Sequence, residues 1–559
     1  MKILFLTHSF NSLTQRLWVE LTGLGHDCPI EFDVNDAVTV EAVELAKPDL
    51  ILAPFLKRAI PEQVWTNHLC LVVHPGPPGD RGPAALDRAI LDGAEEWGVT
   101  VLQAEAEMDA GPVWASRAFP MRPGTKSSLY RNEVTEAAVA AVLEAVDLYS
   151  SSPGLTRGSG ADGRVKPGHD GTGNAFRPAL KQADRAIHWI NDDTATILRK
   201  IRSADGTPGL LDRMAGKPVY LHDAHPAEGL EGTPGAIIAR SGGAVARATT
   251  DGAVWIGHLR RQPDGLKLPA AEVIGEEFLD GLPDLPGYHD LWYEELHGVG
   301  FLHFPFLNGA MSTSQCKRLE RAFIEAAKRP TKVIALMGGP DFWSNGIHLG
   351  TIEHAASPAD ESWANINAMN DLCRAIITCD SHLTIAAMHG NAGAGGVFMA
   401  LAADLVLARD GVVLNPHYKG MGNLYGSEYW TYLLPRRCGA EQADRVVRAR
   451  LPVGAPEATA LGLIDAHFGR DPAEFRAGVV ALAEAAAADP GVDQRLAEKR
   501  LSRLADEQGK PLESYRAEEL AHMKLNFYGF DPSYHVARWN FIRKVPKSRT
   551  PLYLAPHRK

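Results

Sequence analysis

The sequence lacks several features that would assign it to a common class of protein. It has no run of about 18 apolar residues, so we expect no transmembrane helix. The apolar start, Met1–Leu6, is too short for a signal peptide and predicts a first strand instead. The six cysteines form no C-x-x-C pair, which argues against a disulfide framework and against a zinc site of the usual spacing. We therefore expect a cytoplasmic protein with reduced cysteines and no metal site.

Basic residues are outnumbered by acidic ones, 57 to 68. The formal net charge is −11, whereas a non-specific nucleic-acid binder needs lysine and arginine to neutralise phosphates. We therefore expect small-molecule substrates, with neither nucleic acid nor a membrane as a partner. A chain of 559 residues that is 45% hydrophobic and 22% charged is typical of a folded protein with about two to four domains.

The first 150 residues alternate strand patterns with helix patterns. Apolar stretches bounded by proline, glycine or aspartate predict strands at Ile3–Thr7, Leu50–Pro54, Leu69–Val73 and Val99–Ala104. Helical spacing lies between these stretches. The alternation predicts a doubly wound, parallel sheet over residues 1–150 of an α/β multidomain protein.

A glycine-rich stretch follows at residues 151–176. Seven of the 25 residues Ser151–Ala175 are glycine and large apolar side chains are almost absent, which predicts a flexible insert. The segment Arg164–Gly171 contains a histidine and an aspartate, so a functional loop is the alternative. Its composition favours a spacer.

The remaining chain divides into four predicted parts. Short strands with Gly and Pro turns indicate a small β-rich domain at 177–280, followed by a connector at 281–298. Repeated strand-turn-helix units indicate a second α/β domain at 299–485. Residues 486–559 are predicted to form a helical extension whose many aromatic side chains pack against one of the domains.

The first candidate site contains a histidine and an aspartate. His74 follows a strand pattern and precedes the Pro/Gly loop Pro75–Gly82, which places it at the carboxyl end of a strand, where open α/β sheets bind ligands. Asp109 follows a later strand and precedes Ala110–Pro112. Such a pair can move a proton during acyl transfer. By themselves, two residues this far apart also fit an ordinary structural role.

The surrounding motifs resemble those of the folate-dependent formyltransferases, such as glycinamide ribonucleotide and methionyl-tRNA formyltransferases. The resemblance covers about residues 1–145 and extends into the next domain; its motifs are His74-Pro75-Gly76, Arg81-Gly82-Pro83, Gly98–Val101, Asp109–Pro112, Ile187–Trp189 and Ile201–Gly209. It implies 10-formyl-tetrahydrofolate as the formyl donor, with His74 and Asp109 as catalytic residues. It also places Phe55, Leu56 and Arg81 on the folate side.

The chain departs from that family at one catalytic position. The family has an asparagine two residues before the histidine, and Val72 stands there in this sequence. Donors that stabilise an oxyanion in this way contribute about 3–4 kcal/mol. Either another donor replaces the asparagine, or the formyl group is handled differently. Residues 177–277 hold 13 Lys/Arg against 13 Asp/Glu, so the second domain has no basic excess to bind tRNA.

The second candidate site consists of two strand ends that run into glycines, Phe342–Ile347 and His389–Gly396. Glycines let backbone N–H groups approach a ligand closely, and a helix that follows adds its positive end. Two N–H groups that face one point stabilise a thioester oxyanion. A glycine-rich turn alone is more often only a tight turn.

The whole segment from about 299 to 470 resembles the crotonase (enoyl-CoA hydratase/isomerase) superfamily. The motifs are Leu307–Met311, Trp343–Leu349, Gly390–Gly396, Ala403-Asp404 and Ala455–Asp465. The resemblance implies a crotonase-like α/β spiral and a coenzyme A thioester. It places the oxyanion hole at the backbone N–H groups of Ile347 and Gly395, and Gly346 and Gly396 on the coenzyme A side.

The catalytic acids of the hydratases are replaced. The resemblance aligns their two glutamates with Phe398 and Tyr418. Phenylalanine cannot transfer a proton and tyrosine is a poor base near neutral pH, so water addition is not expected. Tyr418 and Glu428, ten residues apart, form the candidate catalytic pair for a different reaction. The alternative is that both residues only line the core.

The two modules in this order resemble a family of [NiFe]-hydrogenase maturation proteins. That resemblance implies formyl transfer from 10-formyl-tetrahydrofolate to coenzyme A, followed by decarbonylation of formyl-CoA to carbon monoxide and free coenzyme A. The chain would then be both a formyltransferase and a lyase. The hydrogenase large-subunit precursor, or other maturation proteins, would be its partners. The alternatives are a formyl-folate hydrolase joined to an enoyl-CoA hydratase, and a non-catalytic maturation chaperone.

Overall fold

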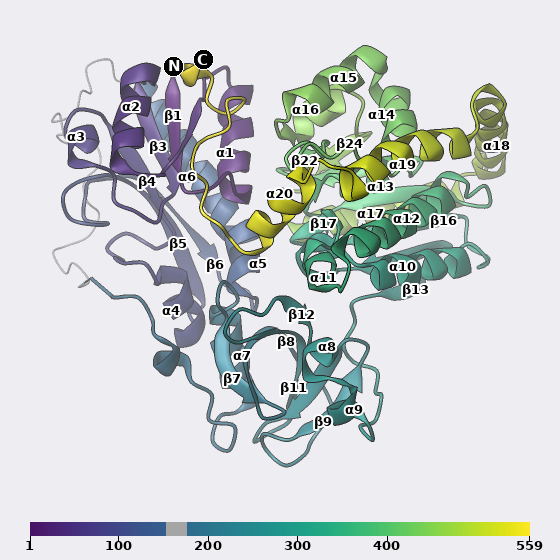
Figure 1. Cartoon of the computed structure of the whole chain (residues 1–559), viewed down its shortest axis with the longest axis horizontal. Helices are drawn as coiled ribbons and strands as arrows, with labels where there is room; N and C mark the ends of the chain where they lie inside the picture. The colour runs from purple at the N-terminus through teal and green to yellow at the C-terminus, as the bar shows by residue number, and fades with distance from the viewer. Residues whose placement is uncertain (152–175) are drawn as a thin grey trace. The chain divides into compact units, whose positions relative to one another are not determined.

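The computed structural model describes residues 1–151 and 176–559, so almost all of the predicted insert at 151–176 lies outside the described residues. The described chain forms two compact units (Figure 1). The first contains residues 1–288 together with 546–559, and the second contains residues 289–545. Each unit is described by itself.

The first unit begins with a six-stranded sheet in the order β2-β1-β3-β4-β5-β6. Its strands are β1 (Ile3–Thr7), β2 (Ile30–Phe32), β3 (Leu50–Phe55), β4 (Cys70–His74), β5 (Glu96–Gln103) and β6 (Val113–Pro120). The first four strands are parallel, as predicted. The expectation of a wholly parallel sheet is wrong for β5 and β6, which run antiparallel to their neighbours. The direct loop 104–112 explains the β5–β6 pair, because strands joined without a crossover pair antiparallel; β4 and β5 are joined through the helix at Ala85–Asp92 and also pair antiparallel.

Helices cover this sheet. They are α1 (Ser12–Gly23), α2 (Asp36–Ala46), α3 (Glu62–Trp65), α4 (Ala85–Asp92), α5 (Lys126–Leu129) and α6 (Thr135–Ser151). The side chains of Asn11 and Asn35 accept hydrogen bonds from backbone N–H groups in the first turns of α1 and α2, which explains why these helices begin there. The helix α6 packs against both α1 and the antiparallel strands β5 and β6 (Figure 1).

The predicted β-rich domain follows in the same unit. An antiparallel sheet has the order β7-β8-β11-β10-β9, and β12 pairs with β11. The elements are α7 (Thr194–Ser203), β7 (Leu210–Met214), β8 (Lys217–Pro226), β9 (Ile237–Ser241), β10 (Ala244–Ala248), β11 (Ala253–Arg261), β12 (Lys267–Pro269), α8 (Ala270–Ile274) and α9 (Glu276–Leu279). The helix α7 lies against β8 and buries Ile197 and Ile201 in the apolar core of this domain.

The second unit is built on a sheet in the order β13-β14-β16-β19-β21-β24, of which only β13 is antiparallel. Its strands are β13 (Trp292–Leu296), β14 (Val299–Phe304), β16 (Val333–Gly338), β19 (Leu383–Met388), β21 (Leu405–Arg409) and β24 (Ala466–Phe468). After β16, β19 and β21 the chain turns into a short strand of a second sheet: β17 (Phe342–Ser344), β20 (Asn391–Gly393) and β22 (Val413–Asn415). This repeated strand-turn-strand unit is the predicted α/β spiral.

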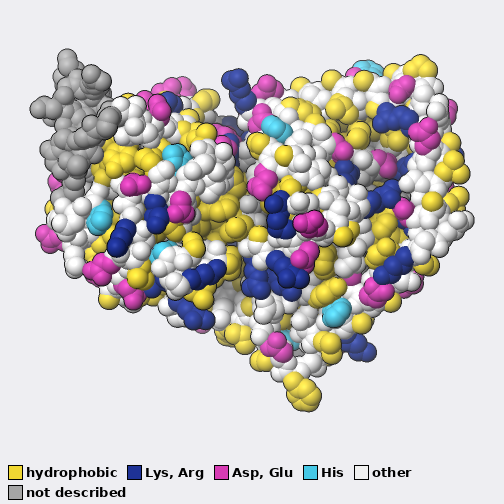
Figure 2. Space-filling view, turned by 90° about the horizontal axis from the view of Figure 1, so that it is seen from above, with side chains coloured by type: hydrophobic (Ala, Val, Ile, Leu, Met, Phe, Trp, Pro, Cys, Tyr) yellow, Lys and Arg dark blue, Asp and Glu magenta, His cyan; other side chains and the backbone are white. Residues whose placement is uncertain are grey.

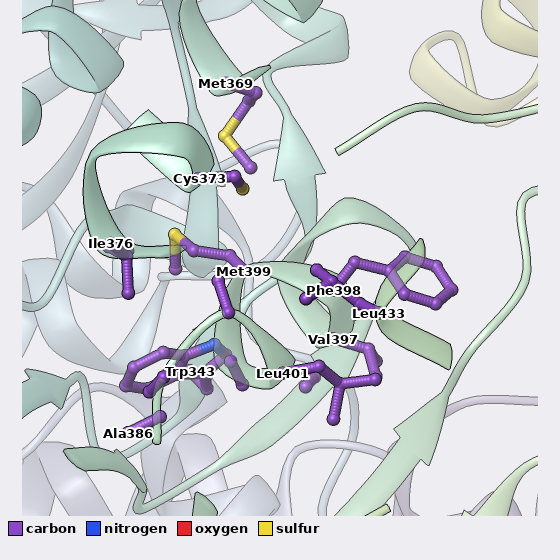
Figure 3. Packing of buried hydrophobic residues seen from close by; sticks show 14 of the residues in the cluster. Trp343, Met369, Cys373, Ile376, Ala386, Val397, Phe398, Met399, Leu401 and Leu433 are labelled. Carbon is purple, nitrogen blue, oxygen red and sulfur yellow. The ribbon is translucent and has the colours of Figure 1, made fainter. Parts of the chain in front are cut away.

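The remaining short strands of this unit are β15 (Ala310–Met311), β18 (Gly346–Ile347) and β23 (Val453–Gly454). Its helices are α10 (Thr313–Ala326), α11 (Leu349–His354), α12 (Pro358–Ile377), α13 (Gly395–Leu401), α14 (Trp430–Cys438), α15 (Ala440–Ala449), α16 (Ala455–Ala460), α17 (Pro472–Ala488), α18 (Val492–Gly509), α19 (Leu512–Tyr528) and α20 (Ser533–Ile542). A large apolar core joins α10, α12 and α13 to the sheets, and Figure 3 shows its centre around Trp343 and Phe398.

The C-terminal helices are only partly buried. Phe527 and Tyr534 lie in the core as predicted, whereas Phe530 and Trp539 are exposed.

No helix in the described part of the chain is long and apolar enough to cross a membrane. On the face seen in Figure 2, lysine and arginine side chains are interspersed with aspartate and glutamate.

The last residues of the chain return to the first unit. The backbone N–H of Ile30 donates to the carbonyl of Leu554 at 2.8 Å, along the edge of β2. The fully buried carboxylate of Glu31 accepts hydrogen bonds from Thr550 (2.5 Å) and Arg558 (2.6 Å), and His557 lies 3.0 Å away. The C-terminal segment therefore covers a sheet edge that would otherwise be open.

Candidate active sites

The first site lies at the carboxyl end of β4. His74 is the last residue of this strand, and only 5% of its surface is exposed. Val72 lies two residues earlier, and side chains two residues apart in a strand point to the same face. A partly buried, apolar side chain therefore stands beside His74 on that face, at the position of the formyltransferase asparagine.

A second carboxylate, which the sequence did not single out, is hydrogen-bonded to His74. Asp80 Oδ2 lies 2.8 Å from His74 Nε2, and Arg177 donates a hydrogen bond to Asp80 Oδ1. Burial would raise the pKa of Asp80, but the hydrogen bonds with His74 and Arg177 hold it below its usual value. Asp80 is therefore an ionised partner of His74. A methyl group at Gly76 would lie 2.6 Å from His74 Nε2, so only glycine fits there.

Asp109 lies on the other side of the imidazole. Its Oδ2 is 3.6 Å from His74 Nδ1, and it accepts a hydrogen bond of 3.0 Å from the N–H of Gly82. Asp109 has a φ of 54°, a left-handed conformation that few residues other than glycine adopt. The structure thus brings His74 and Asp109 together as expected. The two ring nitrogens of His74 face one carboxylate each.

The residues expected on the folate side occupy two places. Phe55 and Leu56 lie at the end of β3, the strand next to β4, and both are half-buried. Arg81 instead donates to the carbonyl of Met108 at 3.1 and 3.3 Å and pairs with Glu107 at 2.8 Å. These contacts hold Arg81 against the turn that carries Asp109.

The second site brings the two glycine motifs together. A methyl group at Gly346 would lie 3.2 Å from the backbone nitrogen of Gly395, and one at Gly396 would lie 2.0 Å from the carbonyl oxygen of Ser344. The indole N–H of Trp343 donates to the carbonyl of Gly396 at 2.9 Å. Ile347, the other expected oxyanion residue, is the neighbour of Gly346 in β18.

The expected catalytic pair is adjacent to these glycines. Tyr418 donates a hydrogen bond of 2.6 Å to Glu428 Oε2, and it also lies 2.9 Å from the carbonyl oxygen of Ser427. A methyl group at Gly395 would lie 2.3 Å from Glu428 Oε1. Oε1 of the Glu428 carboxyl group therefore points at Gly395, the expected oxyanion residue, and Oε2 accepts the hydrogen bond from Tyr418.

The pair is deeply buried, which changes its acid–base chemistry. Burial and the nearby charge of Glu519 raise the pKa of Glu428 to about 8, although the hydrogen bond from Tyr418 opposes this shift. Burial and the Glu428 charge raise the pKa of Tyr418 well above its usual value. Near neutral pH, Glu428 can therefore both accept and return a proton, while Tyr418 stays a hydrogen-bond donor.

Phe398 makes this site apolar. It lies in α13, is fully buried, and stacks on Tyr418 with ring centroids 5.3 Å apart. Figure 3 shows its side chain in the buried apolar cluster that also contains Val397, Leu401 and Leu433. A phenylalanine thus occupies the position that the crotonase resemblance assigns to a hydratase glutamate.

Two residues outside the expected set hold the turn that carries Glu428. The side chain of Asn370, in α12, accepts a hydrogen bond of 2.7 Å from the N–H of Glu428. Glu519, in α19, accepts a hydrogen bond of 3.0 Å from the N–H of Tyr429. No motif in the sequence indicates either residue, because each lies on a helix that is distant in sequence from the turn of Glu428. Among the described residues, no group of three or more His, Cys, Asp or Glu is placed to hold a metal ion.

Comparisons with known families agree with the two predicted modules. Residues 33–146 match the family model for formyl transferase, 179–274 the one for the formyl transferase C-terminal domain, and 302–523 the one for enoyl-CoA hydratase/isomerase. Methionyl-tRNA formyltransferase of Geotalea uraniireducens is 27% identical over 274 residues, which cover 48% of this chain and 82% of that protein. The protein is thus a formyltransferase module followed by a crotonase-type module.

More similar relatives contain both modules. Hydrogenase maturation factor HoxX of Bradyrhizobium diazoefficiens is 57% identical over 562 residues, covering 100% of this chain and 97% of that protein. The crystal structure of HypX from Aquifex aeolicus in complex with tetrahydrofolic acid is 49% identical, with a TM-score of 0.94 over 100% of this chain and 99% of that one. The chain belongs to the HypX/HoxX family of hydrogenase maturation factors.

Proposed function

We propose that this chain makes carbon monoxide for a [NiFe]-hydrogenase in two steps, from 10-formyl-tetrahydrofolate through formyl-CoA. The observation that carries the proposal is the buried Tyr418–Glu428 pair, which faces Gly395 where a crotonase binds a thioester oxygen. The tetrahydrofolic acid in the related HypX structure supports a folate donor for the first module. The crotonase-type fold supports coenzyme A as the acceptor.

In the first step, the thiol of coenzyme A attacks the formyl carbon. A C–S bond forms, the bond from carbon to N10 of the folate breaks, and the thiol proton moves to N10. His74 is the group that moves this proton, because it lies between the carboxylates of Asp80 and Asp109. The two carboxylates stabilise the imidazolium that forms when His74 holds the proton.

In the second step, formyl-CoA loses carbon monoxide. The Glu428 carboxylate accepts the formyl proton, the C–H electron pair becomes the lone pair on the carbon of carbon monoxide, and the C–S pair leaves with sulfur. The proton returns from the Glu428–Tyr418 pair to the sulfur and gives free coenzyme A. The backbone N–H groups of Gly395 and Ile347 hold the thioester oxygen. The pKa of about 8 for Glu428 suits both transfers.

Water must be excluded for this outcome, since hydrolysis of formyl-CoA would give formate instead. Phe398 stacks on Tyr418 and fills the place of a water-activating glutamate. It supplies neither a base nor a hydrogen-bonding group to hold a water molecule. The surroundings of the pair therefore favour decarbonylation over hydration or hydrolysis.

The test is to incubate the purified protein with 10-formyl-tetrahydrofolate and coenzyme A, trap carbon monoxide with a haem protein, and measure formate in the same samples. Carbon monoxide that depends on coenzyme A is expected. The His74→Ala variant should lose formyl-CoA and carbon monoxide together, whereas Tyr418→Phe should lose carbon monoxide alone. Formate release without coenzyme A would show a formyl-folate hydrolase, and steady turnover of crotonyl-CoA would show a hydratase. If both variants still supported hydrogenase maturation, a non-catalytic chaperone would be the better description.

A further inference from the structure

We propose that Glu519, on the C-terminal helix α19, is a positioning residue that holds Glu428 against the oxyanion glycines. This inference rests on the proposed decarbonylase function, and it adds a part of the chain that the crotonase motifs do not include. The hydrogen bonds of Glu519 go to Ser427, Tyr429 and Thr431, so it acts through the turn on which Glu428 lies.

The Glu519 carboxylate accepts hydrogen bonds from four donors in that turn. Its Oε2 accepts from the N–H of Tyr429 at 3.0 Å and from the hydroxyl of Ser427 at 3.2 Å. Its Oε1 accepts from the N–H and the hydroxyl of Thr431, at 2.9 and 2.6 Å. These donors flank Glu428 on both sides. One buried carboxylate thus fixes the backbone before and after the candidate catalytic acid.

The turn needs such a restraint because its backbone is strained. Glu428 has a φ of 60° and Tyr429 a φ of 59°, so two successive residues other than glycine lie in the strained left-handed region. Left to itself, the segment would relax and carry the Glu428 carboxyl group away from Gly395. The hydrogen bonds to Glu519 and Asn370 oppose this relaxation.

One face of α19 makes all of these contacts. Met523 lies four residues after Glu519 and Asn526 seven residues after it, so the three side chains share a helical face. The N–H of Gly426 lies 3.2 Å from the sulfur of Met523, and the N–H of Tyr425 donates to Asn526 at 3.0 Å. The helix α19 therefore contacts the turn from Tyr425 to Thr431 and restrains it.

Glu519 also acts on Glu428 through its charge. Burial raises the pKa of Glu519 to about 7, while its four donors favour the ionised form. Its negative charge contributes to the raised pKa of Glu428. The other titratable groups near Glu428 are Tyr418 and the buried thiols of Cys316 and Cys373, which burial keeps neutral at physiological pH. Removal of the Glu519 charge should therefore lower the pKa of Glu428.

Glu519→Gln is the decisive variant, because each carboxylate oxygen accepts from one backbone N–H group, and such a group cannot accept a hydrogen bond. Either orientation of the amide turns its NH₂ group toward the N–H of Tyr429 or of Thr431 and leaves that N–H unpaired. Glu518→Gln is the matched control: it is the same change at the preceding residue, whose exposed side chain pairs with Lys510 at 2.7 Å. Carbon monoxide, formyl-CoA and hydrogen exchange of the peptide around residues 425–432 would be measured for both.

We expect Glu519→Gln to lower the rate of carbon monoxide formation by about 10- to 100-fold, which is less than the roughly 10²- to 10⁴-fold loss expected when a general base itself is removed, with formyl-CoA formation unchanged. The midpoint of the remaining pH–rate curve should move to lower pH, and amide exchange at Tyr429 and Thr431 should become faster. A Glu519→Gln protein that matches Glu518→Gln overturns the inference. So does an equal loss of both activities with an unmoved pH midpoint, since that indicates only a structural role.

The proposed function and this inference fail in different ways. If the wild-type protein makes no carbon monoxide, the decarbonylase proposal is wrong, and hydrogen exchange then decides the positioning role. Faster exchange at Tyr429 and Thr431 in Glu519→Gln, but not in Glu518→Gln, still supports it. Unchanged exchange refutes it.

Discussion

Replacement of Glu428 by glutamine should separate the two steps of the reaction. Glutamine keeps the size of the side chain and can still accept a hydrogen bond from Tyr418, which lies 2.6 Å from Oε2 in the wild type. It cannot accept the formyl proton. Removal of a general base lowers a rate by about 10²- to 10⁴-fold, so carbon monoxide should almost disappear. Formyl transfer is proposed for the other unit, and formyl-CoA should therefore accumulate.

The pKa of Glu428 sets the pH dependence of the wild-type reaction. With a pKa of about 8, roughly one tenth of the enzyme carries an ionised Glu428 at pH 7 and half of it does at pH 8. If the carboxylate removes the formyl proton, the rate of carbon monoxide formation should rise about fivefold over this interval and level off at higher pH. The rate rises with pH because the ionised form of Glu428 is the base.

Single-turnover measurements with saturating 10-formyl-tetrahydrofolate and coenzyme A would test this. Carbon monoxide is followed by haem absorbance, and formyl-CoA by chromatography after an acid quench. Glu441→Gln, an exposed position in α15, is the control and should behave as the wild type. Wild-type carbon monoxide formation by Glu428→Gln, or a rate that falls between pH 7 and 8 while formyl-CoA is abundant, would refute the role of Glu428 as the base.

Three further outcomes are expected. Asp80→Asn removes the ionised partner of His74 and should lower formyl-CoA and carbon monoxide together by about 10- to 100-fold; loss of carbon monoxide alone would contradict this. Gly395→Ala places a methyl group 2.3 Å from Oε1 of Glu428, so carbon monoxide should fall about 100-fold or more while formyl-CoA still forms, and a fully active variant would argue against the site geometry. Glu31→Gln leaves the C-terminal arginine and histidine beside a neutral side chain and should destabilise the first unit by about 3–5 kcal/mol, seen as a lower midpoint of thermal unfolding; an unchanged midpoint would mean that the tail contributes little.

Much of the fold could be predicted because it depends on local patterns. The strand at Ile3–Thr7 has the predicted limits, since a short apolar run followed by polar residues is recognisable by itself. The β-rich domain could be predicted for the same reason. The antiparallel course of β5 could not, because strand direction depends on which neighbour the strand meets after folding.

Parts of the candidate sites could also be proposed from local patterns. His74, Asp109, Tyr418 and Glu428 lie in or beside recognisable motifs, and the structure places the two members of each pair close together. Asp80 lies only six residues from His74, yet nothing in the Pro/Gly loop marks it as a partner. The loop has to fold back over the imidazole before the two side chains can meet.

The amino-acid sequence alone determined the types of module, their order, and the loss of the hydratase glutamates at Phe398 and Tyr418, because each of these is a property of short segments. Only the tertiary structure decided that Asp80 is hydrogen-bonded to His74 and that Glu519 holds the turn of Glu428. Glu519 and Tyr429 are 90 residues apart in the chain, and no local pattern records such a contact. Hydrogen bonds between distant segments form only where packing brings those segments together. Here such bonds keep Asp80 ionised beside His74 and fix the orientation of Glu428.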